Sequence, residues 1–318
     1  MHTVLIGLTP SFSGRLAAAA AAAGLPPACC CPAGRETAAA APDGLKVFSS
    51  RAELFSSVKG PGLAVVSGPA ESRFAAALEA LERGFHALCE PPFCFSVSDF
   101  ERLRDAAAGR GLALGALQPR DRCQAWRELD SLVTSGRLGR VSWAQAEIFS
   151  SAAAPDGGVL AAEGWNAFSG LLALTRLPPL AISARLSPSP GKGEAPADLS
   201  AVAAVQFGGA DGVVRVAAGA HASGERYAVA GDKGRAELSG RALTVELAGS
   251  GSATALFASG PAAASLDQGC LSAELLDFGK EAAGEMAAGS SLRNSRYCAK
   301  LLKNAYYSAS LRSAAVPL

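Results

Sequence analysis

The chain has 318 residues and a mass of 32.0 kDa, which is long for one hydrophobic core and sufficient for two. Hydrophobic residues make up 49% of the chain and charged residues 18%, a composition that excludes a disordered or fibrous protein. The chain has 29 Lys and Arg and 28 Asp and Glu, so its charges nearly balance. No basic stripe is available to neutralise phosphates, and no nucleic-acid partner is expected.

No signal for a membrane or an oxidising compartment is evident in the sequence. Residues 16–34 contain no charge, but Gly24, Pro26 and Pro27 interrupt that run, so it predicts no membrane span. The eight cysteines have neither CxxC nor Cys/His spacing, which favours buried free thiols and no metal site. Free thiols suit a reducing compartment, so we expect a cytoplasmic protein.

Residues 1–120 alternate short apolar runs with longer helical segments. Strands are expected at 4–8, 28–31, 63–66, 85–89 and 112–117, and helices at 14–23, 70–83 and 97–109. Strands that are apolar throughout and separated by helices predict a doubly wound parallel sheet, covered on both faces.

Residues 121–318 have a different pattern. Helices are expected at 122–134 and 165–174, and a strand at 141–149. Short strands separated by glycine turns follow to residue 247, which is typical of an antiparallel meander. The segment 187–196 reads as an exposed loop, and two helices are expected at about 267–288 and 295–313. The sequence therefore predicts an α/β first domain (1–120) and an α+β second domain (121–318) with a large, mostly antiparallel sheet.

Five short segments, in order, resemble the Gfo/Idh/MocA oxidoreductases. Residues 84–92 (GFHALCEPP) are similar to that family's glycine–strand–Glu-Lys-Pro segment, and 135–141 (SGRLGRV) to its turn into the second domain. Residues 157–160 (GGVL) with Gly164 resemble its glycine-led helix entry, 231–234 (GDKG) a sheet turn, and 307–310 (YSAS) its closing helix. The resemblance implies a Rossmann-like first domain that holds NAD or NADP, and hydride transfer to a sugar or similar polyol.

The cofactor loop departs from the family pattern. A dinucleotide site needs glycines after the first strand so that backbone N–H groups reach the pyrophosphate. Here the loop is Gly7-Leu8-Thr9-Pro10-Ser11-Phe12, in which Thr9 and Phe12 replace two glycines and Pro10 removes a donor. Glu36 comes late for the acidic residue that holds the ribose. We therefore expect NAD or NADP binding to be weak or absent. The residues that could contribute to it are Gly7, Thr9, Ser11, Phe12, Ser67, Pro69 and Glu90.

The catalytic positions implied by the resemblance are also altered. The family's lysine falls at Pro91, and its aspartate and histidine fall at Ala162 and Asn166; none of these three side chains can titrate near neutral pH. Glu90 is retained from the Glu-Lys-Pro segment. Glu163 adjoins the lost aspartate position but is expected to point elsewhere, being one step around a helix.

Gln118 and Arg120, after the last strand of the first domain, are expected to hold a polar ligand in the cleft between the domains. Trp165 and Asn166 could join them there, although Trp165 is equally consistent with a place in the core. Arg120 suits a carboxylate or phosphate. His86, at the start of a core strand, is interpreted as structural.

Three functions remain open on the sequence. The first is a divergent NAD(P)-dependent oxidoreductase; the second is a catalytically degenerate member that binds a small polar ligand or a partner subunit; the third is a different chemistry in the same cleft, such as that of a lyase or hydrolase. We expect the second. We also expect a homo-oligomer formed through one face of the second sheet, because Ala201, Ala203, Val205, Val213 and Val216 exceed what one buried face needs.

Overall fold

The computed structural model describes residues 1–9, 12–33, 41–42, 44–153, 157–188, 198–287, 289 and 292–318. Pro10 and Ser11 of the predicted cofactor loop, Glu36 and most of the predicted loop at 187–196 lie outside these residues. The chain forms two compact units. Unit 1 comprises Met1–Arg122 and Ala264–Ser295, and unit 2 comprises Cys123–Ala263 and Arg296–Leu318. No helix in the described part of the chain is long and apolar enough to cross a membrane.

Unit 1 is built around a parallel sheet of six strands in the order β3-β2-β1-β4-β5-β6, which confirms the predicted doubly wound domain. Its two central strands, β1 and β4, are almost wholly buried, because helices cover both faces of the sheet. The elements are β1 (His2–Leu8), α1 (Ser13–Ala22), β2 (Pro27–Pro32), β3 (Lys46–Val47), α2 (Arg51–Ser57), β4 (Gly62–Val66), α3 (Ala70–Glu82), β5 (Phe85–Cys89), α4 (Val97–Ala108), β6 (Leu114–Ala116), the 3₁₀ turn η2 (Pro119–Arg122) and α7 (Gln268–Ala282).

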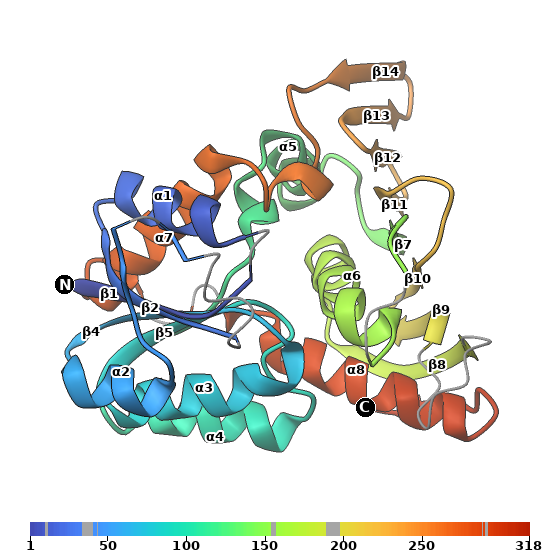
Figure 1. Cartoon of the computed structure of the whole chain (residues 1–318). Coiled ribbons are helices and arrows are strands. Elements are labelled where there is room, and N and C mark those ends of the chain that lie inside the picture. The colour runs from blue at the N-terminus through green and yellow to red at the C-terminus, as the bar shows by residue number, and fades with distance from the viewer. Residues whose placement is uncertain are drawn as a thin grey trace. The chain divides into compact units, whose positions relative to one another are not determined.

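The alanine-rich helix α1 shares one face of this sheet with α7, whereas α2, α3 and α4 lie on the other (Figure 1). Leu16, Ala19 and Ala20 of α1 are fully buried in a cluster that also contains Leu271 and Leu275 of α7. Alanine allows the two helices to approach closely, since it adds little bulk between them. The alanine run is therefore a packing surface rather than a membrane segment.

Unit 2 contains a sheet of nine strands in the order β14-β13-β12-β11-β7-β10-β9-β8-β15. It is antiparallel except between β7 and β10, which confirms the predicted large, mostly antiparallel sheet. The elements are α5 (Gln124–Thr134), β7 (Val141–Phe149), α6 (Val159–Thr175), β8 (Pro179–Pro188), β9 (Asp198–Phe207), β10 (Ala210–Ala217), β11 (Gly224–Gly231), β12 (Gly234–Ser239), β13 (Ala242–Leu247), β14 (Gly251–Leu256), the 3₁₀ turn η3 (Pro261–Ala263), α8 (Ser295–Ser310) and β15 (Val316–Pro317).

The apolar meander residues proved to face mostly one way. Ala201, Ala203, Val205 and Val216 are buried on the face that packs against α6, so the expectation that they form an exposed pairing face was wrong for them. Only Val213 has the opposite orientation, because side chains alternate along a strand. The open face instead carries Val202, Ala204 and Val213 beside charged residues.

Two of the segments that suggested the family meet in unit 2. The Asp232 carboxylate accepts a hydrogen bond from Arg140 N at 3.0 Å, and Lys233 N donates to Leu138 O at 3.0 Å. Gly139 has a φ of +74°, and a Cβ there would lie 1.8 Å from Asp232 Oδ1. The glycines in these segments are therefore required for a close contact between a turn and a hairpin.

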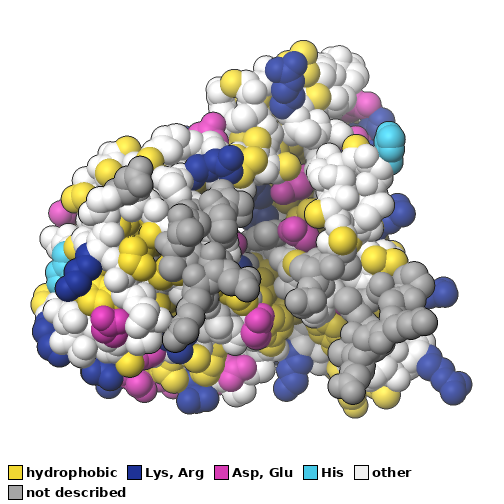
Figure 2. Space-filling view, in the orientation of Figure 1, with side chains coloured by type: hydrophobic (Ala, Val, Ile, Leu, Met, Phe, Trp, Pro, Cys, Tyr) yellow, Lys and Arg dark blue, Asp and Glu magenta, His cyan; other side chains and the backbone are white. Residues whose placement is uncertain are grey.

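All eight cysteines are free and buried, as the sequence predicts. Burial raises the pKa of Cys29 to about 11 and that of Cys89 to about 12, so these thiols stay protonated and unreactive at neutral pH. On the face drawn in Figure 2, Lys and Arg side chains are dispersed over the surface rather than gathered in one patch.

Candidate functional site

The carboxyl ends of β1 and β4 touch through two glycines. Gly7 and Gly68 have φ values of +76° and +87°. A Cβ on Gly7 would lie 2.2 Å from Ser67 O, and one on Gly68 would lie 2.3 Å from Gly7 O. Ser67 closes the contact, because its backbone N and its Oγ both donate to Ile6 O, at 2.9 and 3.3 Å. Gly7 therefore serves the contact between two strands, a role distinct from binding a phosphate.

The turn from β1 into α1 is only partly described. Phe12 N donates to Thr9 O at 3.2 Å, so one backbone donor of the loop is already used internally. The half-buried Phe12 ring packs against the core cluster around Leu5, Leu8 and Leu16. Ser11 lies outside the described residues.

At the carboxyl ends of β4 and β5, a buried arginine occupies the corner where the catalytic lysine was expected. Arg73, on α3, donates through Nε to Gly68 O at 2.8 Å and through Nη1 to Pro91 O at 2.6 Å and Pro92 O at 3.3 Å. Its Nη2 pairs with Glu90 Oε2 at 3.1 Å. Burial lowers the pKa of Arg73 and Glu90 opposes this effect, so the ion pair keeps the guanidinium charged. Pro69 begins the same turn, ahead of α3.

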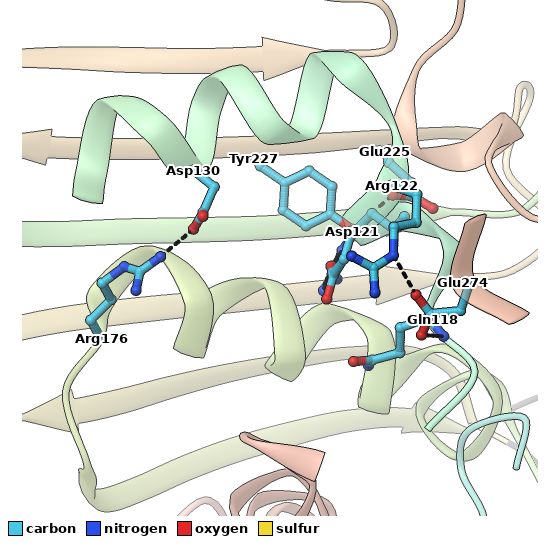
Figure 3. Close-up of polar contacts among 9 residues, drawn as sticks. Gln118, Asp121, Arg122, Asp130, Arg176, Glu225, Tyr227 and Glu274 are labelled. Carbon is cyan, nitrogen blue, oxygen red and sulfur yellow. Dashed lines mark hydrogen bonds and ion pairs between the residues drawn. The ribbon is translucent and has the colours of Figure 1, made fainter. Parts of the chain in front are cut away.

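The residues after β6 form a second polar group in unit 1. Arg120, mostly buried, binds Asp121 Oδ1 through Nε and Nη2 at 3.1 and 3.0 Å. Figure 3 shows the neighbouring Arg122 directed at Glu274 of α7, with 2.8 Å between Nε and Oε2. Gln118 N approaches Glu274 Oε1 at 3.5 Å. Sequence reasoning missed Glu274 because nothing in the local pattern of α7 distinguishes it from a solvent-facing glutamate.

In unit 2, a buried aspartate holds the start of α6. Asp198 Oδ2 accepts from Leu160 N at 2.7 Å, and Tyr306 Oη approaches Asp198 Oδ1 at 3.4 Å. Gly158 precedes the helix with a φ of +90°, and a Cβ there would lie 2.0 Å from Asp198 Oδ1. The glycine-led helix entry is thus explained: Asp198, from β9, supplies the cap that Gly158 itself lacks.

We expect Asp198→Ala to lower the unfolding free energy of unit 2 by about 1–2 kcal/mol, since the first turn of α6 loses its cap. Asp211→Ala, which removes an exposed carboxylate from β10, is the matched control and should change little. Urea unfolding followed by tryptophan fluorescence measures this, because Trp126, Trp143 and Trp165 all lie in unit 2. Equal stability of the two variants would contradict the capping role.

The helix α6 also carries the predicted residues of the second domain. Trp165 is fully buried, which favours its interpretation as a core residue, whereas Ala162 and Asn166 are half-buried. Glu163, expected to point away from the lost aspartate position, shares a hydrogen bond with the side chain of Asn166. Residues three apart share a helix face, and that spacing could have revealed the pair. Burial raises the pKa of Glu163, so its carboxyl group holds a proton more readily than an exposed one.

His86 is structural, as predicted, because its Nδ1 accepts a hydrogen bond from Ala113 N at 2.9 Å and burial lowers its pKa. No group of three or more His, Cys, Asp and Glu side chains in the described ranges could hold a metal ion. Of the predicted site residues, unit 1 brings together Gly7, Ser67, Glu90 and Pro91 near Arg73. Unit 2 brings together Glu163 and Asn166.

Comparison with known proteins shows the same architecture. Residues 3–117 match the sequence model of Gfo/Idh/MocA, described as an oxidoreductase family with an NAD-binding Rossmann fold. No curated protein matches the chain.

Several solved structures are similar over the whole chain. An Agrobacterium radiobacter oxidoreductase in complex with NAD⁺, L-tartaric acid and magnesium has a TM-score of 0.84 at 16% identity, and the match covers 100% of this chain and 98% of that one. A levoglucosan dehydrogenase in complex with NADH and L-sorbose gives 0.83 at 18%, with coverage of 100% and 98%. An oxidoreductase domain protein from Kribbella flavida gives 0.82 at 21%, with coverage of 99% and 98%. At these identities the likeness shows the fold alone.

Proposed function

We propose that this chain, whose residues 3–117 match the Gfo/Idh/MocA oxidoreductase family, is a catalytically degenerate member of that family that binds a small polar ligand without transferring hydride. The proposal rests on the corner formed by Arg73 and Pro91. In the family pattern a lysine follows the glutamate of the fifth strand, and it can contact a substrate oxygen. In this chain proline stands there, and its carbonyl oxygen accepts from Arg73 at 2.6 Å.

Arg73 cannot replace that lysine, because its guanidinium is committed to the scaffold. Four partners from two segments surround it: the carbonyls of Gly68, Pro91 and Pro92, and the carboxylate of Glu90. Moving the guanidinium toward a ligand would leave these carbonyls without a donor, at a cost of about 1–3 kcal/mol for each that stayed buried. Glu90, the retained acidic residue, is held by the same ion pair.

The described residues fit a dinucleotide poorly. Of the three glycines of the binding pattern, only Gly7 is present, and its lack of a side chain already serves the contact with Ser67 and Gly68. Phe12 takes the place of the glycine that permits close helix–strand packing, and its N–H is bonded to Thr9. We infer that NAD or NADP binds weakly or not at all.

A hydride-transfer assay tests the proposal. We expect no change in nicotinamide absorbance with NAD, NADP, NADH or NADPH across a panel of sugars, polyols and their oxidised forms. The same panel should be screened without nucleotide for ligand-induced thermal stabilisation, together with dicarboxylates and sugar phosphates, because Arg120 suits an anion. Stabilisation by a panel member that is lost in Arg120→Met would support the binding role, and steady turnover would contradict the proposal.

The pair of Glu163 and Asn166 favours a second candidate function, a divergent NAD(P)-dependent oxidoreductase acting on a sugar or polyol-like substrate. A carboxyl group with a raised pKa is suited to exchange a hydroxyl proton near neutral pH, and Asn166 orients it. This candidate predicts turnover that Glu163→Gln lowers by about 10²–10⁴-fold. Glu128→Gln on α5 serves as the control. Absence of turnover in the wild-type protein would eliminate the candidate.

We also propose that unit 2 pairs with a second copy through its open sheet face, in a reducing, cytoplasmic setting. Val202 is 45% exposed there, with Ala204 and Val213 beside it. A stable contact of this kind buries more than about 1,000 Å². Val202→Glu should therefore weaken association at micromolar concentration, which light scattering measures. A monomeric wild-type mass in that range would contradict the pairing.

A further inference from the structure

The strand β14 is an unprotected edge of the nine-stranded sheet. It pairs with β13 on one side, and it is the outermost strand of that end of the sheet (Figure 1). All six of its residues are exposed, and Leu256 is 69% exposed, the largest fraction among the exposed large hydrophobic side chains. An edge strand of this kind presents backbone N–H and C=O groups that another strand can bind.

The chain protects its other sheet edges. Within the described residues the edge strand β3 has two residues and includes Lys46, the edge strand β6 has three, and β15 has two and includes Pro317. Short strands, lysine and proline are the means by which proteins prevent edge pairing. None of these is present in β14, so its edge differs from the other three.

The composition around β14 indicates which strand can bind it. Residues 248–261 contain no charged side chain, in a chain of which 18% is charged. The charged side chains of an incoming strand would find no opposite charge on β14. A strand with the uncharged composition of β14 itself meets no unfavourable group. We propose that β14 pairs antiparallel with β14 of a second copy, which joins two sheets into one.

The sequence of β14 is complementary to itself in this arrangement. A two-fold axis at Thr254 places Leu256 of one copy opposite Ser252 of the other, Ala253 opposite Ala255, and Thr254 opposite Thr254. The bulkiest side chain thus meets a small one, and no two like charges face each other. Because a two-fold contact is closed, it yields a pair of molecules rather than a fibre.

This contact is separate from the open-face pairing. It uses backbone groups at the strand edge, and the helix α5 packs on β12 and β13 rather than on β14. Two six-residue strands bury less area than a standard interface of about 1,200–2,000 Å², so the pairing should be weak and concentration-dependent. The β14 contact therefore doubles the mass of the assembly that forms through the open sheet face.

Sedimentation equilibrium on the full-length protein tests the proposal. Thr254→Lys places lysines from both copies close to the two-fold axis and should weaken the doubling by about tenfold or more, whereas Ser239→Lys, on the interior strand β12, should leave it unchanged. Thr254→Glu should behave like Thr254→Lys alone, and an equimolar mixture of the two should restore the doubling, since opposite charges then meet.

A second arm identifies the register. Thr254→Cys should form an intermolecular disulfide on mild oxidation, because the register places Thr254 of the two copies opposite each other; the eight native thiols are buried. Identical masses for the wild type and Thr254→Lys at every concentration, or a doubling abolished only by Val202→Glu, would overturn the proposal. Recovery in the mixed Lys and Glu sample would exclude a partner of another sequence.

Discussion

Replacing Arg73 with methionine is expected to lower the unfolding free energy of unit 1 by about 2–4 kcal/mol, because three carbonyl oxygens and Glu90 lose their common buried donor. Methionine retains most of the apolar stem, so the loss reports the guanidinium rather than a cavity. The effect measures how far the turn at Pro91, where the resemblance implies a catalytic lysine, depends on Arg73.

The measurement must follow unit 1 rather than unit 2. All three tryptophans lie in unit 2, so urea unfolding should be monitored by far-ultraviolet circular dichroism together with amide exchange of β4 and β5. Glu90→Gln is the matched control. It removes the charge from a partly exposed carboxylate and should cost less than about 1 kcal/mol. If Arg73→Met also lowered the unfolding free energy by less than about 1 kcal/mol, the hydrogen bonds of Arg73 would be dispensable for the stability of unit 1.

The stability of unit 1 is expected to fall as pH rises from about 4.5 to about 7, because burial raises the pKa of Glu274 to about 7. Its side chain is 5% exposed, whereas that of Arg122 is 34% exposed, so water screens the arginine and desolvation outweighs the ion pair. A carboxyl group whose pKa is higher in the folded state contributes stability that is present below its unfolded pKa and lost as pH rises through its folded pKa.

The contribution of Glu274 to this loss is on the order of 3 kcal/mol. Glu274→Gln stays neutral and should remove that part of the pH dependence, whereas Asp277→Asn, whose partner is Arg122 at 3.1 Å, should not. Urea unfolding at several pH values, with the difference between wild type and variant as the readout, isolates the group from other titrating residues. Parallel pH curves for the wild type and Glu274→Gln would contradict the assignment.

The sequence predicted the fold well because the signals were local. Apolar runs separated by helices indicated the parallel sheet, and glycine turns between short strands indicated the meander. Strands β8 and β14 were missed, since the first begins and ends at proline and the second consists mostly of small residues. The parallel pairing of β7 with β10 depends on contacts between distant residues, which no local pattern carries.

The candidate site was predictable only in part. The substitutions at Pro91, Ala162 and Asn166 could be read from the sequence, but their consequences depended on side chains distant in sequence. Arg73 reaches Pro91 across 18 positions, and Asp198 reaches Leu160 across 38. The hydrogen bond between Glu163 and Asn166 was within reach of helix periodicity, and it was missed because a single step around the helix was considered rather than three.

Titration of the purified protein with NADH and NADPH, followed by nicotinamide fluorescence, tests the central claim most directly. The account predicts no saturation in the micromolar range, because losing several phosphate contacts worth about 1.5–3 kcal/mol each weakens binding by orders of magnitude. It also predicts that Phe12→Gly combined with Pro10→Gly restores nothing, since the one remaining loop glycine, Gly7, still serves Ser67 and Gly68. A micromolar dissociation constant for either nucleotide would contradict the account and favour the oxidoreductase.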